Sequence, residues 1–596
     1  MQKKYLRLCL LVTVMSMQAQ SLRAQAASAL NAPFQLYADS VIAALSTEYK
    51  IPGCAVAITD NGKVVFQSTY GYINVEKKVP VAPDSQFRLG SVTKMFTAMA
   101  IMQLVEQGKV DLEAPVEQYI TDLKIRQLKP GNPVRIRHLL THTSGFTDEV
   151  FNYSYGGQAQ PQQRLVALAS EEVLTIEPDY IFNYSNVGYG LLGVVIERVS
   201  GLSYSEYTEQ YLFRPLGLRA TAAYYNVPND EKVALGYNAK GTRVDEPLTR
   251  DIAAGGVFST IEDLVILNQA LVNPEVLEQA GVLRRATFEM MCRPQTSNLT
   301  LATDEKFGLG LFIIPLGIKD DDLIGDAIGH GGDFSFHHAI TMVFPKAKLG
   351  ISIVCNGEQG DAFYQKLYHR MLRKYYAINR NAEGAKSNPG KTFSALGLQN
   401  EKIDHREISG IYGGGGSGYV RLERVNEQKI RFKQGKNVLL LKRNDATNRY
   451  HVRYKLLRLF PIKVKDMEFA FLKVDDRIVL KACYLGSGDF EYISRKDIAN
   501  GVPKDWVNRA GTYEIVNSFP GNVSIVPERL TIVQQKLVMH RHYLLTGEKD
   551  EIGFDIIDEK TAVSDGIDRG CAATLKVLPN GNLYYSGYEM RLVYTK

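Results

Sequence analysis

The most distinctive chemical feature of the chain is a serine and a lysine one helical turn apart, Ser91 and Lys94. The mostly apolar run after them has helical periodicity and ends at Gly108, a residue typical of a helix end. Residues three apart on a helix share a face, so the lysine amine can reach the serine oxygen. Burial favours the neutral amine, which can take the serine proton, and the helix start favours negative charge developing beside it. The pair predicts an activated nucleophile; the alternative is a helix-capping serine followed by an exposed lysine.

Two further groups carry side chains suited to the same chemistry. In Tyr184-Ser185-Asn186, a tyrosine beside a cation can pass a proton and the asparagine amide can hold a substrate carbonyl. His330-Gly331-Gly332 is the only H-x-G in the chain, and its glycines would let a substrate backbone approach closely. The alternatives are a packed aromatic at Tyr184 and a turn residue ahead of a strand at His330.

Other histidines raise the possibility of a metal site. His138 and His142 are four residues apart, but the glutamate of a zinc-binding H-E-x-x-H motif is missing. His337 and His338 follow Asp333 closely, yet neighbours on a strand face opposite sides of the sheet. We expect no metal. The sequence also lacks G-x-S-x-G, which counts against an α/β-hydrolase.

Taken together, these motifs resemble those of the serine β-lactamase-like hydrolases, a family that includes class C β-lactamases, D-alanyl-D-alanine carboxypeptidases, D-aminopeptidases and related esterases. The resemblance covers about residues 34–378 and follows the family's order: Ser91-x-x-Lys94, Tyr184-x-Asn186, then His330-x-Gly332. Supporting segments are IRHLLTHTSGF and AAGGVFSTIEDL. No K-[ST]-G occurs, so the histidine motif looks like the family's variant of its third motif.

The resemblance implies a role for each residue. Ser91 would be the acylated nucleophile, Lys94 its proton acceptor, and Tyr184 the group that passes the proton to the leaving group and later activates water. Asn186 would orient the substrate amide, His330 would tune Tyr184, and Gly331 and Gly332 would line the substrate. The backbone N–H groups of Ser91 and Asp333 would form the oxyanion hole. One departure is the bulky DFSFHH after H-x-G, which puts the shape of the substrate in doubt.

The surrounding patterns predict the elements that position these groups. Residues 34–49 read as an amphipathic helix, and two alternating runs joined by Asp60-Asn61-Gly62 read as a hairpin. A β-type run at 337–357 and a helix follow a long helical and loop-rich region. The expected fold of 34–378 is an α/β (α+β) sandwich, an antiparallel sheet flanked by helices, with a helical subdomain.

A polar segment at 379–403 predicts a linker, and alternating strands and turns beyond it predict two all-β barrel-like modules, 404–498 and 506–596. A weak repeat supports two modules, since SGIYGG is echoed by AGTYEI and FEYISR by MRLVYTK. We expect the modules to restrict access to the serine or bind part of the substrate and to contribute no chemistry. The alternative is a pair of tethered barrels with a cell-envelope role.

The N-terminus predicts export. Residues 1–26 combine a basic start, a short apolar core and small residues, which is typical of a signal peptide. They hold four basic and no acidic residues, so without them the formal charge falls from +6 to +2, and nothing indicates nucleic-acid binding. No later run is apolar enough to span a membrane. Scattered cysteines suggest no disulfide framework and read as buried small hydrophobes.

The sequence therefore predicts an exported (periplasmic or extracellular) serine hydrolase that needs no cofactor. It would act through an acyl-enzyme on amide or ester bonds of a small-molecule or peptide substrate, such as D-amino-acid peptides or related esters. The alternatives are a β-lactamase and a catalytically idle cell-envelope binding protein.

Overall fold

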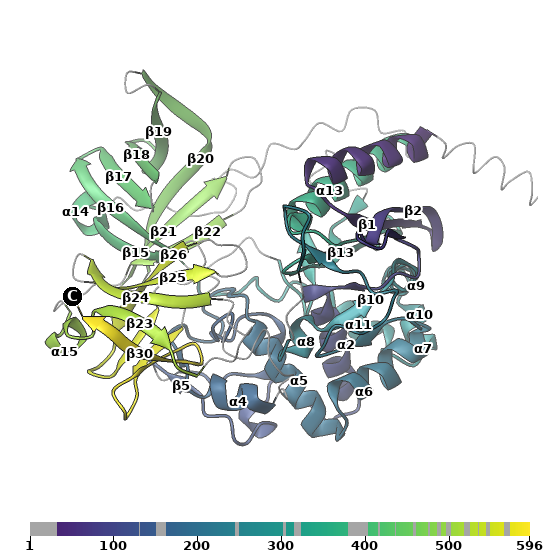
Figure 1. Ribbon diagram of the computed structural model, residues 1–596, viewed down its shortest axis with the longest axis horizontal. Coiled ribbons are helices and arrows are strands. Elements are labelled where there is room, and N and C mark those ends of the chain that lie inside the picture. The colour runs from purple at the N-terminus through teal and green to yellow at the C-terminus, as the bar shows by residue number, and fades with distance from the viewer. Residues whose placement is uncertain are drawn as a thin grey trace, which may run out of the picture.

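The computed structural model contains an N-terminal domain of helices and strands and two β-barrels (Figure 1). It describes residues 33–596 except 130, 151–162, 245–248, 302–305, 315–323, 380–402, 415–417, 435–436, 457–459, 475–476, 485–489, 496–501, 518–524, 534–535, 544–548, 565–572 and 596. The expected signal peptide and all but the ends of the expected linker lie outside the described residues.

The N-terminal domain (residues 33–379) is built on one antiparallel sheet of seven strands in the order β11-β12-β13-β14-β1-β2-β3. Its strands are β1 (Gly53–Asp60), β2 (Lys63–Asn74), β3 (Val79–Pro80), β11 (Phe312–Ile314), β12 (Ala327–Phe334), β13 (His337–Phe344) and β14 (Leu349–Cys355). The predicted hairpin is confirmed: Asn61 and Gly62 connect β1 to β2 with φ of 49° and 73°, as a two-residue turn requires.

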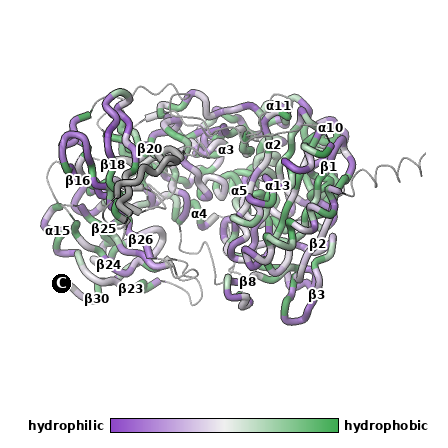
Figure 2. Tube along the Cα trace, turned by 90° about the horizontal axis from the view of Figure 1, so that it is seen from above, coloured by the Kyte–Doolittle hydropathy of each residue, from purple (hydrophilic) through white to green (hydrophobic). Residues whose placement is uncertain are grey.

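Helices cover both faces of this sheet. In β1, Val56 and Ile58 face a core shared with the helix at 33–48 and α13 (Gly360–Asn379). Ala55 and Ala57 alternate with them and face a larger core on the opposite side. Hydrophobic colouring gathers where the helices meet the sheet (Figure 2). The predicted sandwich is therefore confirmed.

The larger core belongs to the helical subdomain, which lies between β3 and β11 in sequence. Its helices are α2 (Thr93–Glu106), α3 (Ile136–Leu140), α4 (Gln163–Ala169), α5 (Asn186–Ser200), α6 (Tyr204–Thr208), α7 (Arg214–Leu216), α8 (Ile252–Gly255), α9 (Ile261–Val272), α10 (Glu275–Gln279) and α11 (Arg285–Met291), with the 3₁₀ turns η1 (Gly90–Val92) and η2 (Val116–Gln118) and the π-helix η3 (Glu209–Phe213). Short strands β4 (Phe87–Arg88), β5 (Arg126–Gln127), β6 (Val173–Leu174), β7 (Ala222–Ala223), β8 (Gly236–Tyr237), β9 (Arg243–Val244) and β10 (Val257–Ser259) connect them.

The prediction of two all-β barrel-like modules is confirmed, and each module is a closed barrel of eight strands. The first barrel contains β15 (Gly410–Gly414), β16 (Gly418–Asn426), β17 (Lys429–Gln434), β18 (Asn437–Asn444), β19 (Arg449–Leu456), β20 (Phe460–Val474), β21 (Arg477–Tyr484) and β22 (Phe490–Arg495). The second contains β23 (Gly511–Ile515), β24 (Ile525–Val533), β25 (Lys536–Tyr543), β26 (Lys549–Ile556), β27 (Thr561–Ser564), β28 (Thr574–Val577), β29 (Leu583–Tyr585) and β30 (Tyr588–Thr595).

The sequence repeat has a structural basis. SGIYGG and AGTYEI form the first strands of the two barrels, and FEYISR and MRLVYTK form the last strands. In each barrel the first strand pairs with the last and closes the barrel: β15 with β22 and β23 with β30. A short helix precedes each barrel, α14 (His405–Ile408) and α15 (Lys504–Val507). The repeat therefore marks the two strands that meet at each closure.

The first barrel is docked on the N-terminal domain through apolar side chains. Leu472 and Val479 lie opposite each other on β20 and β21. Their neighbours Phe471 and Leu480 fill the barrel interior, so this pair points outward. It packs with four buried residues of the N-terminal domain: Ile176, Tyr180, Ile181 and Leu301. This shared core does not fit the alternative of barrels that are merely tethered.

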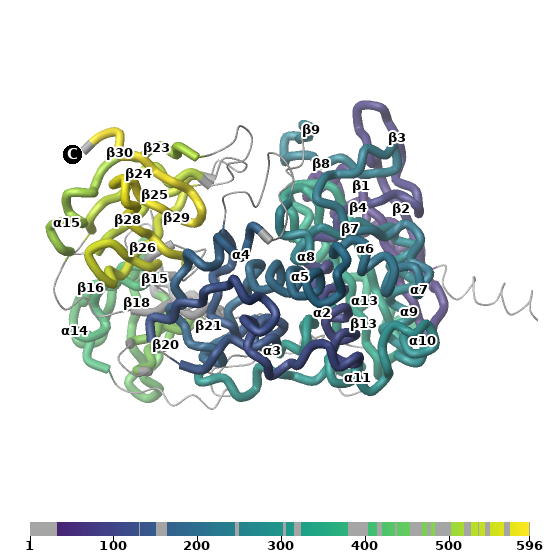
Figure 3. Tube along the Cα trace, turned by 90° about the horizontal axis from the view of Figure 1, so that it is seen from below, coloured from purple at the N-terminus to yellow at the C-terminus, as the bar shows by residue number. Residues whose placement is uncertain are grey.

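The second barrel is docked through polar contacts near α4, beside which it lies in Figures 1 and 3. The Glu172 carboxylate accepts hydrogen bonds from the Thr574 N–H (2.7 Å) and the Tyr584 hydroxyl (2.9 Å). The Val173 N–H donates to the Thr574 hydroxyl (2.8 Å), and Lys576 forms an ion pair with Glu171. Glu172 is only 2% exposed, so this contact places a carboxyl group in a buried interface.

Burial at this interface predicts a pH-dependent stability. It raises the pKa of Glu172 to about 7, against the hydrogen bonds that lower it. Because the folded pKa lies above the unfolded value, the protonated carboxyl stabilises the docked state most fully below about pH 4.5. This contribution, on the order of 3 kcal/mol, is lost as pH rises through about 7. We expect the melting temperature of the wild type to fall between pH 5 and pH 8 by more than that of Glu172→Gln. Equal falls would contradict a titrating Glu172.

Two cysteines lie on neighbouring strands of the sheet. Cys54 and Cys355 are opposite each other on β1 and β14, both buried and both free thiols. Burial raises the pKa of the Cys54 thiol to about 12 and also raises the pKa of the Cys355 thiol well above its usual value. Both behave as the small apolar core residues that the sequence predicted. Among the described residues, no helix combines the length and apolar character needed to cross a membrane.

Candidate active site

Ser91 and Lys94 lie where the chain enters α2. Ser91 is in the single turn η1, and Lys94 is the second residue of α2. The Lys94 amine is completely buried and lies 3.0 Å from the Ser91 hydroxyl oxygen. The alternative of an exposed lysine is therefore wrong, and the one-turn spacing brings the two groups into contact as predicted.

The contacts of the Lys94 amine suit it to take a proton from Ser91. It donates to Asn186 Oδ1 (2.6 Å) and to the Ala254 carbonyl oxygen (2.9 Å), two atoms that can only accept. With two N–H bonds so directed, the lone pair of a neutral amine can face the Ser91 hydroxyl. This geometry brings a general base within hydrogen-bond reach of the proton that it would remove.

The Ala254 carbonyl comes from the AAGG segment, which the sequence marked only as family-like. Residues of α8 and of the following strand β10 contact α2: the Thr97 hydroxyl donates to the Ala253 carbonyl oxygen (2.7 Å), and the Val257 N–H at the start of β10 donates to the Thr93 hydroxyl (3.1 Å). These contacts fix the position of the Ala254 carbonyl relative to Lys94. The segment thus supplies a lysine acceptor through its backbone.

Tyr184 and Asn186 reach the site from the start of α5. Ser185 caps that helix, since its side chain accepts from the Gly188 N–H. The Tyr184 ring is stacked on His142 with centroids 4.1 Å apart, and the Lys94 nitrogen lies 4.9 Å from the Tyr184 centroid. Tyr184 is therefore a packed aromatic that also lies beside Lys94. Its packing does not exclude the proton-transfer role predicted for it.

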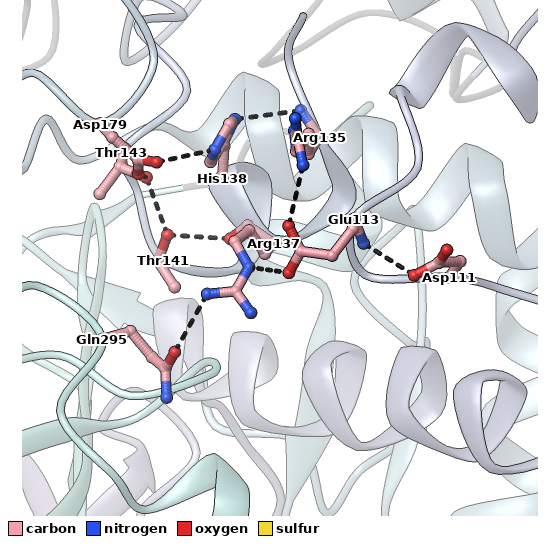
Figure 4. Close-up of polar contacts among 9 residues, drawn as sticks. All are labelled: Asp111, Glu113, Arg135, Arg137, His138, Thr141, Thr143, Asp179 and Gln295. Atoms are coloured by element: carbon pink, nitrogen blue, oxygen red, sulfur yellow. Dashed lines mark hydrogen bonds and ion pairs between the residues drawn. The ribbon is translucent and has the colours of Figure 1, made fainter. Parts of the chain in front are cut away.

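A polar network holds the loop that carries His142 (Figure 4). Asp179 accepts from the Thr143 hydroxyl (2.9 Å) and contacts His138 Nε2 (3.0 Å), while His138 Nδ1 accepts from the Arg135 N–H. His142 has a positive φ of 58°, and its Nδ1 accepts from the Ser185 N–H (3.0 Å). The network therefore joins this loop to the segment that contains Tyr184.

The third motif lies on a strand: His330 is inside β12, which precedes the β-type run predicted at 337–357, so the alternative of a turn residue is wrong. Its ring is 2% exposed, packs on Phe312 with centroids 4.9 Å apart, and lies 6.2 Å from the Tyr184 ring. His330 Nδ1 contacts the Gly331 carbonyl oxygen. The strand therefore brings the histidine to the tyrosine that it is predicted to tune.

β12 passes against η1 with no room for a side chain. A Cβ at Gly332 would lie 2.0 Å from the Leu89 carbonyl oxygen and 2.9 Å from the Ser91 nitrogen. A Cβ at Gly90 would lie 2.8 Å from the Asp333 nitrogen. The backbones that carry the two predicted oxyanion-hole N–H groups are therefore neighbours, as that assignment requires.

The two glycines of the motif are predicted to differ in importance. Gly332→Ala must displace backbone at the nucleophile, so we expect the acylation rate of Ser91 to fall about 10²-fold. Gly331→Ala is the matched control, because its Cβ would meet the Tyr364 side chain, whose hydroxyl lies at 2.9 Å, and no backbone atom. The rate of labelling by a fluorophosphonate measures both. Equal rates in the two variants would show that the close approach of Gly332 does not matter.

The bulky residues after H-x-G pack inward. The Arg88 guanidinium lies 3.3 Å from the centroid of the Phe334 ring, and Phe336 is buried. His337 Nδ1 accepts from the Arg88 N–H, and burial with the nearby Arg88 charge lowers the pKa of His337 to about 3. The neutral His337 is thus part of the core.

The Asp333 side chain is held by residues of the neighbouring strand β13 and of helix α13. Its carboxylate contacts His338 Nδ1 (2.7 Å) and accepts from the Tyr364 hydroxyl (3.4 Å). These contacts fix the backbone next to Gly332. Across the part of the chain that the structure describes, no group of three or more histidine, cysteine, aspartate or glutamate side chains could hold a metal ion.

Two site residues escaped the sequence analysis. Asp148 and Glu149 both accept hydrogen bonds from the Asn186 side-chain amide, at 3.0 and 2.9 Å. The segment has no distinctive spacing, and its only signal is that it directly follows the family-like IRHLLTHTSGF. The role of Asn186 toward a substrate stays a prediction, because its amide hydrogens are directed at these carboxylates here.

Comparisons with known proteins agree with this site. The family model described as Beta-lactamase matches residues 38–375, more than half of the chain. Protein flp of Staphylococcus aureus (strain MW2) is 30% identical over 232 residues, which cover 38% of this chain and 46% of that protein. The putative penicillin-binding protein PbpX of Bacillus subtilis (strain 168) is 26% identical over 262 residues, covering 43% and 61%. The chain thus spans about half the length of the curated relatives it matches.

Solved structures show the same architecture over more of the chain. The octameric penicillin-binding protein homologue from Pyrococcus abyssi is 25% identical, with a TM-score of 0.51, covering 77% of this chain and 99% of that one. SurE with D-Leu has a TM-score of 0.57 at 20% identity, covering 78% and 99%, a likeness of fold. With the three motifs gathered around Ser91 and the family model spanning the N-terminal domain, the chain belongs to the Beta-lactamase family.

Proposed function

We propose that this chain is an exported serine hydrolase that cleaves amide or ester bonds through an acyl-enzyme on Ser91. The observation that carries the proposal is the buried Lys94 amine, 3.0 Å from the Ser91 hydroxyl and bound on its other sides by oxygen acceptors. A binding protein has no need of a buried amine in contact with a serine, which costs free energy on burial.

In the proposed reaction, Ser91 Oγ attacks the substrate carbonyl carbon while Lys94 takes its proton. The oxygen that becomes negative is stabilised by the N–H groups of Ser91 and Asp333. The proton passes by way of Tyr184 to the leaving amine or alcohol. Water activated by the same groups then attacks the acyl-enzyme and restores Ser91.

The substrates are proposed to be D-amino-acid peptides or related esters. The penicillin-binding protein relatives support this class, since their names describe proteins that bind penicillin, a β-lactam. The docked barrels lie against the segment that leads to Tyr184, so they would limit which substrates enter. A β-lactamase would share the acylation step and differ in how fast water releases the acyl group.

The test begins with acylation. The full-length protein is treated with a fluorophosphonate or a β-lactam, and the modified peptide is identified by mass spectrometry. An adduct on Ser91 that is missing in Ser91→Ala supports the proposal. Turnover of a small activated ester, a D-amino-acid peptide and a β-lactam then identifies the substrate class. Failure of every reagent to modify Ser91 in the folded wild type would favour an idle binding protein.

A further inference from the structure

The Asn186 side chain lies between the lysine and two carboxylates. Its Oδ1 accepts from Lys94 (2.6 Å), and its Nδ2 donates to Asp148 Oδ1 (3.0 Å) and to Glu149 Oε1 (2.9 Å). A side-chain amide has two N–H donors, and both are used. Asn186 therefore connects the Lys94 amine to a pair of acidic residues.

These contacts fix the orientation of the amide. Rotating it by half a turn would face Oδ1 toward two carboxylate oxygens and Nδ2 toward an amine, which replaces three attractive contacts with repulsive ones. With Asn186 so oriented, its oxygen holds one N–H of Lys94 and leaves the remaining directions for Ala254 and Ser91. The direction of the lysine lone pair thus depends on the acidic pair.

The two carboxylates differ in their other duties. The backbone carbonyl of Asp148 accepts from the N–H groups of Asn186 (2.9 Å) and Val187 (3.1 Å), so Asp148 also shapes the start of α5. The Glu149 carbonyl oxygen accepts from the Ser586 hydroxyl (3.4 Å), which lies in the β29–β30 turn of the second barrel. The second barrel therefore contacts the backbone of Glu149, while the Glu149 side chain reaches Asn186.

We propose that Glu149 is a positioning residue that acts through Asn186 to aim the Lys94 amine at Ser91. This proposal rests on the proposed acyl transfer. Glu149 is assigned no contact with the reacting atoms. It restrains the amide of Asn186, and the restrained amide keeps the base in line with the serine proton. Hydrogen-bond partners of this kind determine how precisely a reacting group is placed.

Two substitutions in the full-length protein separate positioning from other roles. Glu149→Ala removes the acceptor, and we expect kcat on a small neutral ester to fall about 10- to 100-fold while KM changes little. Glu149→Gln keeps an amide oxygen that can accept the same hydrogen bond, so most of the turnover should return. Glu113→Ala is the control, because Glu113 is an exposed carboxylate whose ion-pair partners are Arg135 and Arg137 (Figure 4).

Other outcomes would overturn the proposal. A rise in KM with unchanged kcat would make Glu149 a substrate-binding residue, and equal losses in Glu149→Gln and Glu149→Ala would show that its charge matters and its hydrogen bond does not. A lower melting temperature with wild-type kcat would make it structural. Labelling of wild-type Ser91 by the fluorophosphonate is measured alongside: if it fails, the proposed function is wrong, whereas equal labelling rates in wild type and Glu149→Ala refute only the positioning role.

Discussion

Replacing Lys94 with methionine is expected to abolish turnover about as completely as Ser91→Ala does, by roughly 10³-fold or more. The two groups work as one unit, since the serine is a weak nucleophile until its proton has been taken. Lys94 is in direct contact with Ser91 and completely buried, so solvent has little chance to replace it as a base. The double variant should lose hardly more than either single variant.

The measurement is turnover of a small ester together with the fluorophosphonate labelling rate. Methionine matches the length of lysine and tolerates an apolar site, so a melting curve should show that Lys94→Met is folded. Lys109→Met, an exposed lysine just beyond α2, is the matched control and should keep wild-type rates. If Lys94→Met retained most of its turnover while Ser91→Ala had none, Lys94 would not be the proton acceptor.

The motifs were predictable because each depends on local geometry. The Ser91–Lys94 contact follows from helical spacing, and the β1–β2 hairpin follows from two turn residues with positive φ. The order of the three motifs along the chain was enough to indicate the sandwich. These predictions needed no knowledge of which segments meet in space.

The supporting groups were not predictable, because they come from distant segments or from backbone atoms. The Ala254 carbonyl accepts from Lys94 across 160 positions of sequence, and any residue type supplies a carbonyl. Glu149 reaches Asn186 from a segment with no spacing signal. His142 supports Tyr184 by stacking, a contact that depends on its positive φ. Only the folded chain places these groups beside the motifs.

Barrel docking was hidden for a different reason. Alternating apolar residues predict a barrel interior, but Leu472 and Val479 add apolar positions on the outer face. In a single sequence such residues look like ordinary strand residues, since isolated apolar side chains are common on protein surfaces. Only the structure therefore shows which surface this outward-facing apolar pair packs against.

Removing both barrels by ending the chain at Asn379 is therefore expected to destroy turnover even of a small ester. Truncation would expose four buried side chains of the N-terminal domain: Ile176, Tyr180, Ile181 and Leu301. At about 1.5–3 kcal/mol for each large apolar side chain, this loss approaches the net stability of a typical domain. Glu172 would also lose its hydrogen bonds to the second barrel.

The damage should centre on Tyr184, the proposed proton carrier. Ile176, Tyr180 and Ile181 belong to the segment between β6 and α5, whose last residues include Tyr184. Without the barrels, the apolar side chains of that segment are no longer covered. The Tyr184 ring, which stacks on His142, is then free to move away from Lys94. A barrel that only restricted access would have the opposite effect, because opening the site would leave small-ester turnover intact and change the preference for longer peptides.

A single substitution tests the same interface in the intact chain. Val479→Asp places a charge in the shared core and is expected to lower both the melting temperature and the turnover. Val438→Asp in the same barrel is the matched control, since Val438 is 54% exposed and should tolerate the charge. If Val479→Asp and the truncated chain both kept wild-type small-ester turnover, the barrels would act on access alone. A joint loss in the two, with Val438→Asp unaffected, would show that the barrels support the catalytic segment itself.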